Sequence, residues 1–237
     1  MKNPLVVGYK GEIGSFILNG LLRITPKAND IMCVDINNSV QEIIDRIDMS
    51  DVIFLCVPIE KTVEWLEQYY HVIHDKMIFE QTSIKGTIFD SYIVKKLNII
   101  PMHIMFRPSG TPDTIHRKVA LFNTPEHRLN LDMMEIIKEI TESQIVFFNS
   151  IETHDKKMAI QQALTHRVLL VLDYMIKSNG HATYVGDRVA ELADRINGGD
   201  EVLYETIQNN QYTMDGVQEM VDKLLGFELN NYWRGKT

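Results

Sequence analysis

The sequence has little cysteine, no excess of positive charge and no long apolar run. Only two of its 237 residues are cysteines, Cys33 and Cys56, and both lie in apolar, strand-like stretches. This excludes a disulfide framework and gives no support for a zinc site, so we expect two buried, reduced thiols. With 24 Lys and Arg against 32 Asp and Glu, the net charge is −8. That balance argues against a nucleic-acid-binding face and against a polybasic membrane anchor.

We expect neither a membrane-spanning segment nor a targeting signal. No stretch approaches the ~20 consecutive apolar residues that a membrane-spanning helix needs. The apolar run in the first residues, MKNPLVV, is too short for a secretory signal peptide. We therefore expect a cytoplasmic protein that binds neither membranes nor nucleic acid.

Residues 1–150 alternate short apolar runs with amphipathic stretches. Strands are expected at Leu5–Gly8, Ile31–Ile36, Asp51–Val57, Met77–Gln81, Ile99–Met105, Lys118–Asn123 and Ile145–Phe148. Helices are expected at Ile13–Arg23, Val40–Ile47, Ile59–Val72, Gly86–Lys96 and Asn130–Thr141. Strand–helix alternation with nearly all-apolar strands predicts an α/β fold, a doubly wound and mostly parallel sheet that is covered on both faces.

Residues 151–237 show helical periodicity without a strand signal. Apolar residues recur at helical spacing from Met158 to Met175, and helical stretches follow at Val185–Ile196, Glu201–Asn209 and Met214–Leu225. The first of these helices is apolar around much of its circumference, so it needs burial on more than one side. We predict a second, all-α domain over residues 151–237 that joins two chains in a homodimer.

A glycine-rich turn follows the first strand. The segment VVGYKGEIG places Gly8, Gly11 and Gly14 between a strand and a helix. Such a turn lets backbone amides approach a pyrophosphate, which then lies at the helix N-terminus. The spacing is GxxGxxG, with Tyr9 in the usual place of a glycine, so the pattern is weak by itself. The loop residues expected at the cofactor are Gly8, Tyr9, Gly11, Glu12, Ile13 and Gly14.

The second and third strands strengthen the dinucleotide hypothesis. Asp35 stands 21 residues after Gly14, where a carboxylate accepts hydrogen bonds from ribose hydroxyls and repels a 2′-phosphate. This favours NAD over NADP as the cofactor. Val57, Pro58 and Thr62 follow the third strand and would flank the bound dinucleotide, because ligands of doubly wound sheets bind at the carboxyl ends of strands. The alternative is a glycine turn with Asp35 as an ordinary surface residue.

Two further strands carry polar side chains near their ends. Thr82, Ser83 and Lys85 follow the fourth strand, and His103 lies in the fifth. A hydride-transfer enzyme needs a group that accepts the proton of the hydroxyl being oxidised, and an imidazole suits that task. Ser83 would orient that imidazole or the substrate. The alternative is a hydrogen-bonded core histidine.

The helical region contributes its own polar candidates. His154, Gln162 and His166 are eight and four residues apart, which puts them on roughly one helical face. Burying such a face without partners is costly, so it faces a cleft, a polar ligand or a hydrogen-bonded network between helices. No HExxH pattern is present, and we expect no metal. Arg195 would either clamp a carboxylate or form a surface salt bridge with a neighbouring aspartate.

Taken together, five segments resemble the prephenate dehydrogenase family, which includes arogenate dehydrogenases. They are VVGYKGEIG, QTSIKG, HIMF, HDKKMAIQQALTH and RINGGDEVLYETI. The resemblance extends from the glycine loop to Ile207, and the joint match is far more specific than any single motif. It implies a Rossmann domain, a helical dimerisation domain and an NAD-dependent oxidative decarboxylation of prephenate or a close analogue.

The same resemblance implies roles for individual residues. His103 would be the catalytic group at the ring hydroxyl of the substrate, with Ser83 as its partner. Arg195 would bind a substrate carboxylate. The residues implied on the long helix are His154, Gln162 and His166.

Two departures from the family pattern leave the substrate open. Ile104 stands where the family usually has proline, and Arg107 stands where glycine is common. Arg107 would contact a substrate carboxylate or a nucleotide phosphate. Prephenate, arogenate and an amino-substituted prephenate all remain candidates. The alternatives are another small-acid or imine oxidoreductase on the same scaffold, and a catalytically silent NAD-binding dimer.

Overall fold

The structure is a computed structural model that describes residues 3–25, 30–110, 114–124, 129–180, 183–198 and 201–225. The chain divides into two compact units, Met1–His154 and Asp155–Thr237. The division falls within helix α7 (Ile151–Met158), whereas the sequence predicts a domain boundary just before that helix, after residue 150.

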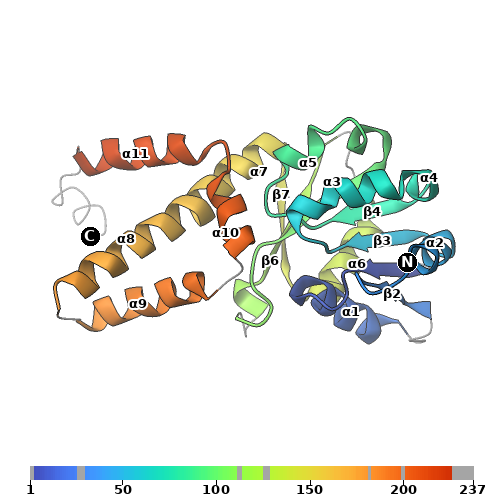
Figure 1. The fold of residues 1–237 in the computed structure, drawn as a ribbon, viewed down its shortest axis with the longest axis horizontal. Coiled ribbons are helices and arrows are strands. Elements are labelled where there is room, and N and C mark those ends of the chain that lie inside the picture. Colours follow the sequence, from blue (N-terminus) through green and yellow to red (C-terminus); the bar gives the residue numbers. More distant parts are fainter. Residues whose placement is uncertain are drawn as a thin grey trace. The chain divides into compact units, whose positions relative to one another are not determined.

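Unit 1 is built on a seven-stranded sheet with the order β2-β1-β3-β4-β5-β6-β7 (Figure 1). Its strands are β1 (Pro4–Val7), β2 (Met32–Val34), β3 (Val52–Leu55), β4 (Met77–Glu80), β5 (Asn98–Ile104), β6 (Lys118–Phe122) and β7 (Gln144–Phe148). Neighbouring strands are parallel except for the antiparallel pair β5 and β6. The predicted mostly parallel sheet is confirmed, and each strand lies within two residues of its predicted limits.

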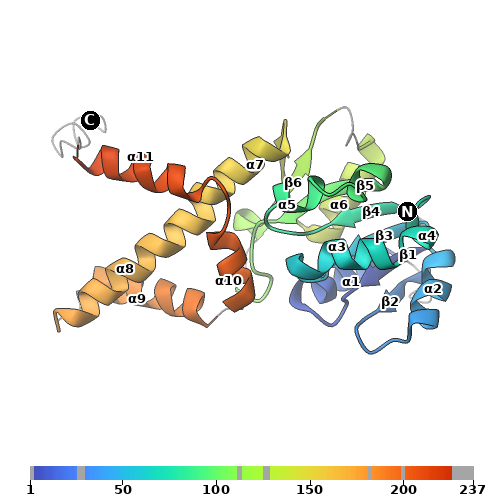
Figure 2. The ribbon, with the colours of Figure 1, turned by 45° about the horizontal axis from the view of Figure 1, so that its top comes forward.

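Helices cover both faces of this sheet, as the apolar strands require (Figures 1 and 2). Successive residues of β1 point to opposite faces, so Leu5 and Val7 belong to one buried cluster and Val6 to another. The cluster around Val6 includes residues of α1 (Glu12–Ile24) and α6 (Leu131–Thr141). The opposite cluster includes residues of α2 (Val40–Asp48), α3 (Ile59–Gln68), α4 (Tyr70–Ile73) and α5 (Gly86–Phe89). The doubly wound α/β fold is thereby confirmed.

Two predicted helices are shorter than expected. The helix predicted at Ile59–Val72 is interrupted at Tyr69, where the backbone (φ −104°, ψ 10°) separates α3 from α4. The helix predicted at Gly86–Lys96 consists of α5 and a single 3₁₀ turn, Val94–Lys96. Asp90 and Ser91 lie between them, and their short polar side chains compete for backbone hydrogen bonds and weaken a helix interior.

Unit 2 is entirely helical in its described part. Helix α7 runs through a π-helical segment, Ala159–Leu164, into α8 (Thr165–Ser178). The remaining helices are α9 (Tyr184–Asn197), α10 (Glu201–Gln208) and α11 (Thr213–Leu225). Helix α9 packs on α8, while α10 and α11 pack on the π-helical segment. Within the described ranges no helix combines the length and the apolar character needed to cross a membrane.

Candidate active site

The glycine loop forms a tight turn between β1 and α1. Gly8 has φ +77°, and a Cβ there would lie 2.5 Å from the Cys56 carbonyl oxygen. A Cβ on Gly14 would lie 2.0 Å from the Gly8 oxygen, so only glycine lets the helix begin this close to the strand. Gly11 is the N-cap of α1, and no side chain caps the helix there. The first turn therefore offers its backbone N–H groups to an anion.

Asp35 lies beside this loop, as the sequence predicts for a ribose ligand. Its Oδ2 accepts a hydrogen bond from the Lys10 backbone N–H at 3.0 Å, and its Oδ1 accepts one from the Ile36 N–H at 2.8 Å. These bonds hold the carboxylate next to the turn that would carry a pyrophosphate. Thr62 is buried on α3 and donates to the Pro58 carbonyl, which fixes the turn after β3. Loop and carboxylate together fit a dinucleotide.

The loop after β5 is fastened to the start of α1 by Glu12. The Glu12 carboxylate accepts hydrogen bonds from the Ser109 N–H at 2.8 Å and the Ser109 hydroxyl at 2.6 Å. Arg107 Nε lies 3.2 Å from the other carboxylate oxygen. Partial burial acts to raise the pKa of Glu12, but Ser109 and the Arg107 charge outweigh it and lower the pKa. Arg107 therefore lies beside the glycine loop. Of the two roles left open for it, this position favours contact with a nucleotide phosphate over contact with a substrate carboxylate.

A buried ion pair closes the end of β4. Glu80 and Lys85 are both fully buried, and Lys85 Nζ lies 2.6 Å from Glu80 Oε2. The same ammonium donates to the Glu80 carbonyl at 3.1 Å and to the Met102 carbonyl on β5 at 2.7 Å. The other Glu80 oxygen accepts from the Thr82 N–H. The sequence indicates a polar strand end here, but nothing in it shows that Lys85 turns inward to join β4 to β5.

His103 and His154 are brought together although 51 positions separate them in the chain. Nδ1 of His103 lies 3.1 Å from Nε2 of His154, and both side chains are buried, at 2% and 0% exposure. The ring of His154 packs against Phe122 and Phe148, with centroids 5.4 and 5.0 Å away. His154 therefore contacts the predicted catalytic histidine and an aromatic wall. The sequence leaves a cleft, a polar ligand and a hydrogen-bonded network open for this side chain, and the structure shows a buried hydrogen-bonded contact.

Burial, the neighbouring His154 and the Lys85 charge hold the pKa of His103 well below its usual value of 6.5. The imidazole is thus neutral at physiological pH, in the state that accepts a proton. Ser83 is half-buried and, among the described residues, forms no hydrogen bond with His103. Nδ1 of the imidazole is engaged by His154, and the role of Ser83 in orienting the imidazole or the substrate stays a prediction.

The candidates of unit 2 lie on three of its elements. Gln162 belongs to the π-helical segment and His166 to α8; within the described residues Gln162 Oε1 and His166 Nδ1 are buried without a hydrogen-bond partner. The ring of His166 stacks on Tyr204 at 6.2 Å, and burial lowers its pKa. Arg195 is exposed on α9, and no described acidic residue pairs with it. These polar groups are available to form hydrogen bonds with a ligand.

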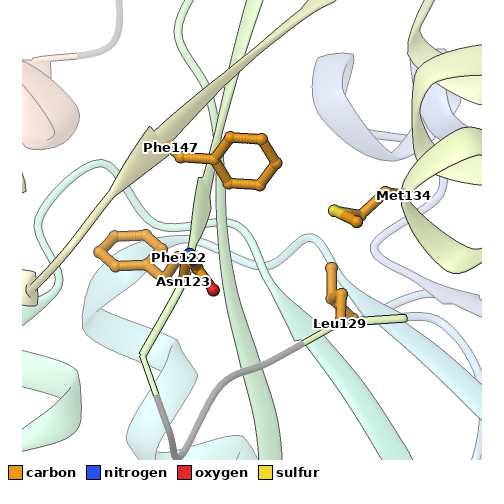
Figure 3. A pocket seen from close by; sticks show the side chains of 5 residues that line it. All are labelled: Phe122, Asn123, Leu129, Met134 and Phe147. Atoms are coloured by element: carbon orange, nitrogen blue, oxygen red, sulfur yellow. The ribbon is translucent and has the colours of Figure 1, made fainter. Parts of the chain in front are cut away.

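A hollow at the end of β6 and β7 is a different feature. It has a volume of about 120 Å³ and is lined by Phe122, Asn123, Leu129, Met134 and Phe147 (Figure 3). Ligand sites usually enclose about 300–1,000 Å³, so this hollow is too small for a dinucleotide. In the described part of the chain, no group of three His, Cys, Asp or Glu side chains could hold a metal ion.

The substitution Gly14→Ala tests the glycine loop. Because the new Cβ would overlap the Gly8 oxygen, the loop must shift and lose hydrogen bonds to the pyrophosphate. We expect dinucleotide affinity to fall about 10–100-fold, the effect of one charge-assisted hydrogen bond. Fluorescence titration with NADH measures this. Gly216→Ala is the control, since its Cβ would meet only ordinary contacts at 3.5 Å. Unchanged affinity in Gly14→Ala would place the nucleotide elsewhere.

Comparison with known proteins identifies a family over part of the chain. The model of the prephenate dehydrogenase nucleotide-binding domain matches residues 25–146. No curated protein matches the chain by sequence.

Solved structures share the fold over 94–100% of this chain. Prephenate dehydrogenase from Aquifex aeolicus, in complex with hydroxyphenyl propionate and NAD+, has a TM-score of 0.75 and 19% identity; the match covers 100% of this chain and 92% of that one. A putative prephenate dehydrogenase from Corynebacterium glutamicum has a TM-score of 0.71 and 15% identity over 94% and 80% of the two chains. Arogenate dehydrogenase from Synechocystis has a TM-score of 0.61 and 17% identity over 98% and 94%.

The solved structures are below 25% in identity and establish the fold. The family model, in contrast, covers more than half of the sequence, from the end of α1 to β7. The chain therefore belongs to the prephenate dehydrogenase family.

Proposed function

We propose that this protein is an NAD-dependent dehydrogenase that oxidatively decarboxylates prephenate or a close analogue. The observation that carries the proposal is His103, a neutral, buried imidazole on β5 whose Nδ1 is held by His154. An imidazole fixed on one side presents its other nitrogen to a substrate. A family member with this arrangement has the base that oxidation of a ring hydroxyl requires.

NAD is the cofactor that fits the first unit best. Gly8–Gly14 provides the approach for a pyrophosphate, and Asp35 favours an unphosphorylated ribose over a 2′-phosphate. The similar structure from Aquifex aeolicus holds NAD+. Bound NAD+ supplies the hydride acceptor. Arg107, tied to the start of α1 through Glu12, adds a cation on the phosphate side.

In the proposed reaction one proton is transferred from the substrate to the protein and then back to the product. The C4–H bond of the substrate breaks with its electron pair, and the hydride goes to NAD+. His103 takes the proton of the C4 hydroxyl as the C4–O double bond forms. CO2 then leaves C1, and the electron pair of the broken bond between C1 and the carboxylate carbon completes the aromatic ring. The resulting phenolate takes the proton back from His103. The products are NADH, CO2 and a phenol, so atoms and charge balance.

NADH formation with a substrate panel tests the proposal. Absorbance at the NADH band is followed with prephenate, arogenate and aminodeoxyprephenate as separate substrates. We expect turnover with at least one of them. If NAD binds and none is oxidised, the protein is a silent NAD-binding module or acts on a different small acid or imine.

The pH profile follows from His103. Burial, His154 and Lys85 depress the pKa of this imidazole, so it stays unprotonated as the pH falls to 6.5 and charges only below that value. The base form is the active one, hence kcat/KM should begin to fall only below pH 6.5. Initial rates across pH 5 to 8 measure this. A half-maximal rate above pH 6.5 would contradict the assignment of His103 as the base.

Arg195→Ala tests the proposed carboxylate contact on α9. Losing a charge-assisted hydrogen bond should raise KM for the substrate about 10–100-fold. Arg188→Ala is the matched control on the same helix, because Arg188 already pairs with Glu191 at 2.6 Å. An unchanged KM in Arg195→Ala would contradict the proposed contact between Arg195 and a substrate carboxylate.

We further propose that unit 2 mediates a homodimer. In α8 the side chains of Val171, Leu172, Tyr174 and Met175 remain 40–74% exposed. Contiguous exposed apolar residues of this kind favour an interface. Sedimentation velocity tests the proposal, and a monomer at micromolar concentration would refute it.

A further inference from the structure

The contact between the two buried histidines restricts where their protons can be. A hydrogen bond between Nδ1 of His103 and Nε2 of His154 contains one proton, so one ring donates and the other accepts. Two neutral imidazoles satisfy this in either direction. The direction decides what His103 presents at its other nitrogen, Nε2.

Only one direction gives a base. If His103 donates from Nδ1, its Nε2 carries a lone pair and can accept a hydroxyl proton. If His154 donates from Nε2 instead, Nδ1 of His103 holds the lone pair and Nε2 carries the hydrogen. In the second case the nitrogen turned away from His154 is a donor and accepts no proton.

The surroundings of His154 hold its ring in place. It is fully buried and lies against Phe122 on β6. Its ring packs edge-on against two others, with interplanar angles of 80° to Phe148 and 78° to His103. The ring cannot withdraw from His103 without opening this aromatic wall. Lys85 fixes the strand from the other side, because its ammonium binds the carbonyl of Met102, the residue before His103.

We propose that His154 is the positioning residue of His103: it accepts the Nδ1–H of His103 and so keeps Nε2 of His103 available as the base. This inference rests on the proposed function for its catalytic meaning. A neutral imidazole takes the position that an ionised carboxylate holds in a catalytic triad. It fixes the tautomer without adding a negative charge to a site that must receive a substrate dianion.

The tautomer can be measured without any substrate. Long-range ¹H–¹⁵N NMR of the cofactor-free protein distinguishes protonated from unprotonated ring nitrogens, and the His103 signals are those missing from His103→Asn. We expect His103 to carry its hydrogen on Nδ1. In His154→Leu, which removes the acceptor, the hydrogen should move to Nε2. In His154→Gln, whose amide oxygen can accept in place of Nε2, the Nδ1–H form should return.

Kinetics provide the second measurement. His154→Leu should lower kcat about 10–100-fold, the cost of leaving a buried polar group unpaired, while KM and NAD affinity stay unchanged. His154→Gln should recover most of kcat. His71→Leu, which changes an exposed histidine on α4, is the control and should leave kcat and KM unchanged.

The outcomes separate the two proposals. A wild-type His103 with its hydrogen on Nε2, or a tautomer that does not respond to His154→Leu, overturns the role of His154. A rise in KM without a fall in kcat in His154→Leu would overturn it too, because it would make His154 a substrate contact. If the wild type oxidises none of the substrates, the proposed function fails, and the tautomer measurement still decides the role of His154.

Discussion

Replacing His103 with asparagine should reduce kcat about 100–10,000-fold, the range that a positioned general base contributes. Asparagine can still hydrogen-bond a hydroxyl but accepts no proton from it. The site should remain assembled, because the glycine loop and Asp35 are held by their own backbone contacts. NADH titration should therefore give an unchanged affinity. Stopped assays with the best substrate of the panel measure the loss.

A matched change elsewhere controls for the loss of a histidine. His71→Asn alters an exposed side chain of α4 and should leave kcat unchanged. If His103→Asn kept most of the activity, the base would be a different group. The reaction would then belong to the other oxidoreductases that use this scaffold, and the proposed chemistry would need to be abandoned.

The fold was predictable because apolar periodicity is a local property. Strands β1 and β3 of unit 1 are apolar on both faces, and the sequence shows this directly. The helices of unit 2 likewise follow from a regular 3.6-residue spacing. The break at Tyr69 was not predictable, since it depends on the backbone geometry of that residue. The loss of helix after Phe89 has a local cause in Asp90 and Ser91, which the periodicity of the apolar residues does not reveal.

The residues of the candidate site were predictable from the sequence, but the contacts between their side chains were not. Strand position, helical spacing and the family resemblance single out His103, His154 and Arg107 respectively, but none of them can show which atoms meet. The antiparallel register of β5 and β6 sets His103 opposite Ala120, and α7 then brings His154 onto the same place. Arg107 reaches Glu12, 95 positions earlier in the chain. Such contacts follow from tertiary structure alone.

The buried Glu80–Lys85 pair links the stability of unit 1 to the position of His103, the proposed base. Burial of both ions is costly, and the pair is tolerated because each charge is matched at close range. The ammonium also joins β4 to β5 at Met102, one residue before His103. The same contact that compensates the Glu80 charge therefore fixes the backbone from which the imidazole projects.

Lys85→Met should accordingly destabilise the protein by about 3–5 kcal/mol, the cost of leaving one buried charge without its partner. That is a large share of a total stability of about 5–15 kcal/mol. Urea unfolding measures the change. The surface variant Lys61→Met is the control, because its ion pair with Glu64 is exposed to solvent and its loss should leave the stability nearly unchanged.

The double variant Glu80→Gln with Lys85→Met distinguishes charge from packing. Removing the second charge relieves the uncompensated ion, so the double variant should be more stable than Lys85→Met alone. If it is not, the contribution of Lys85 comes from its stem and from the Met102 carbonyl. In that case kcat should fall in both variants equally, because the end of β5 loses the same support in each.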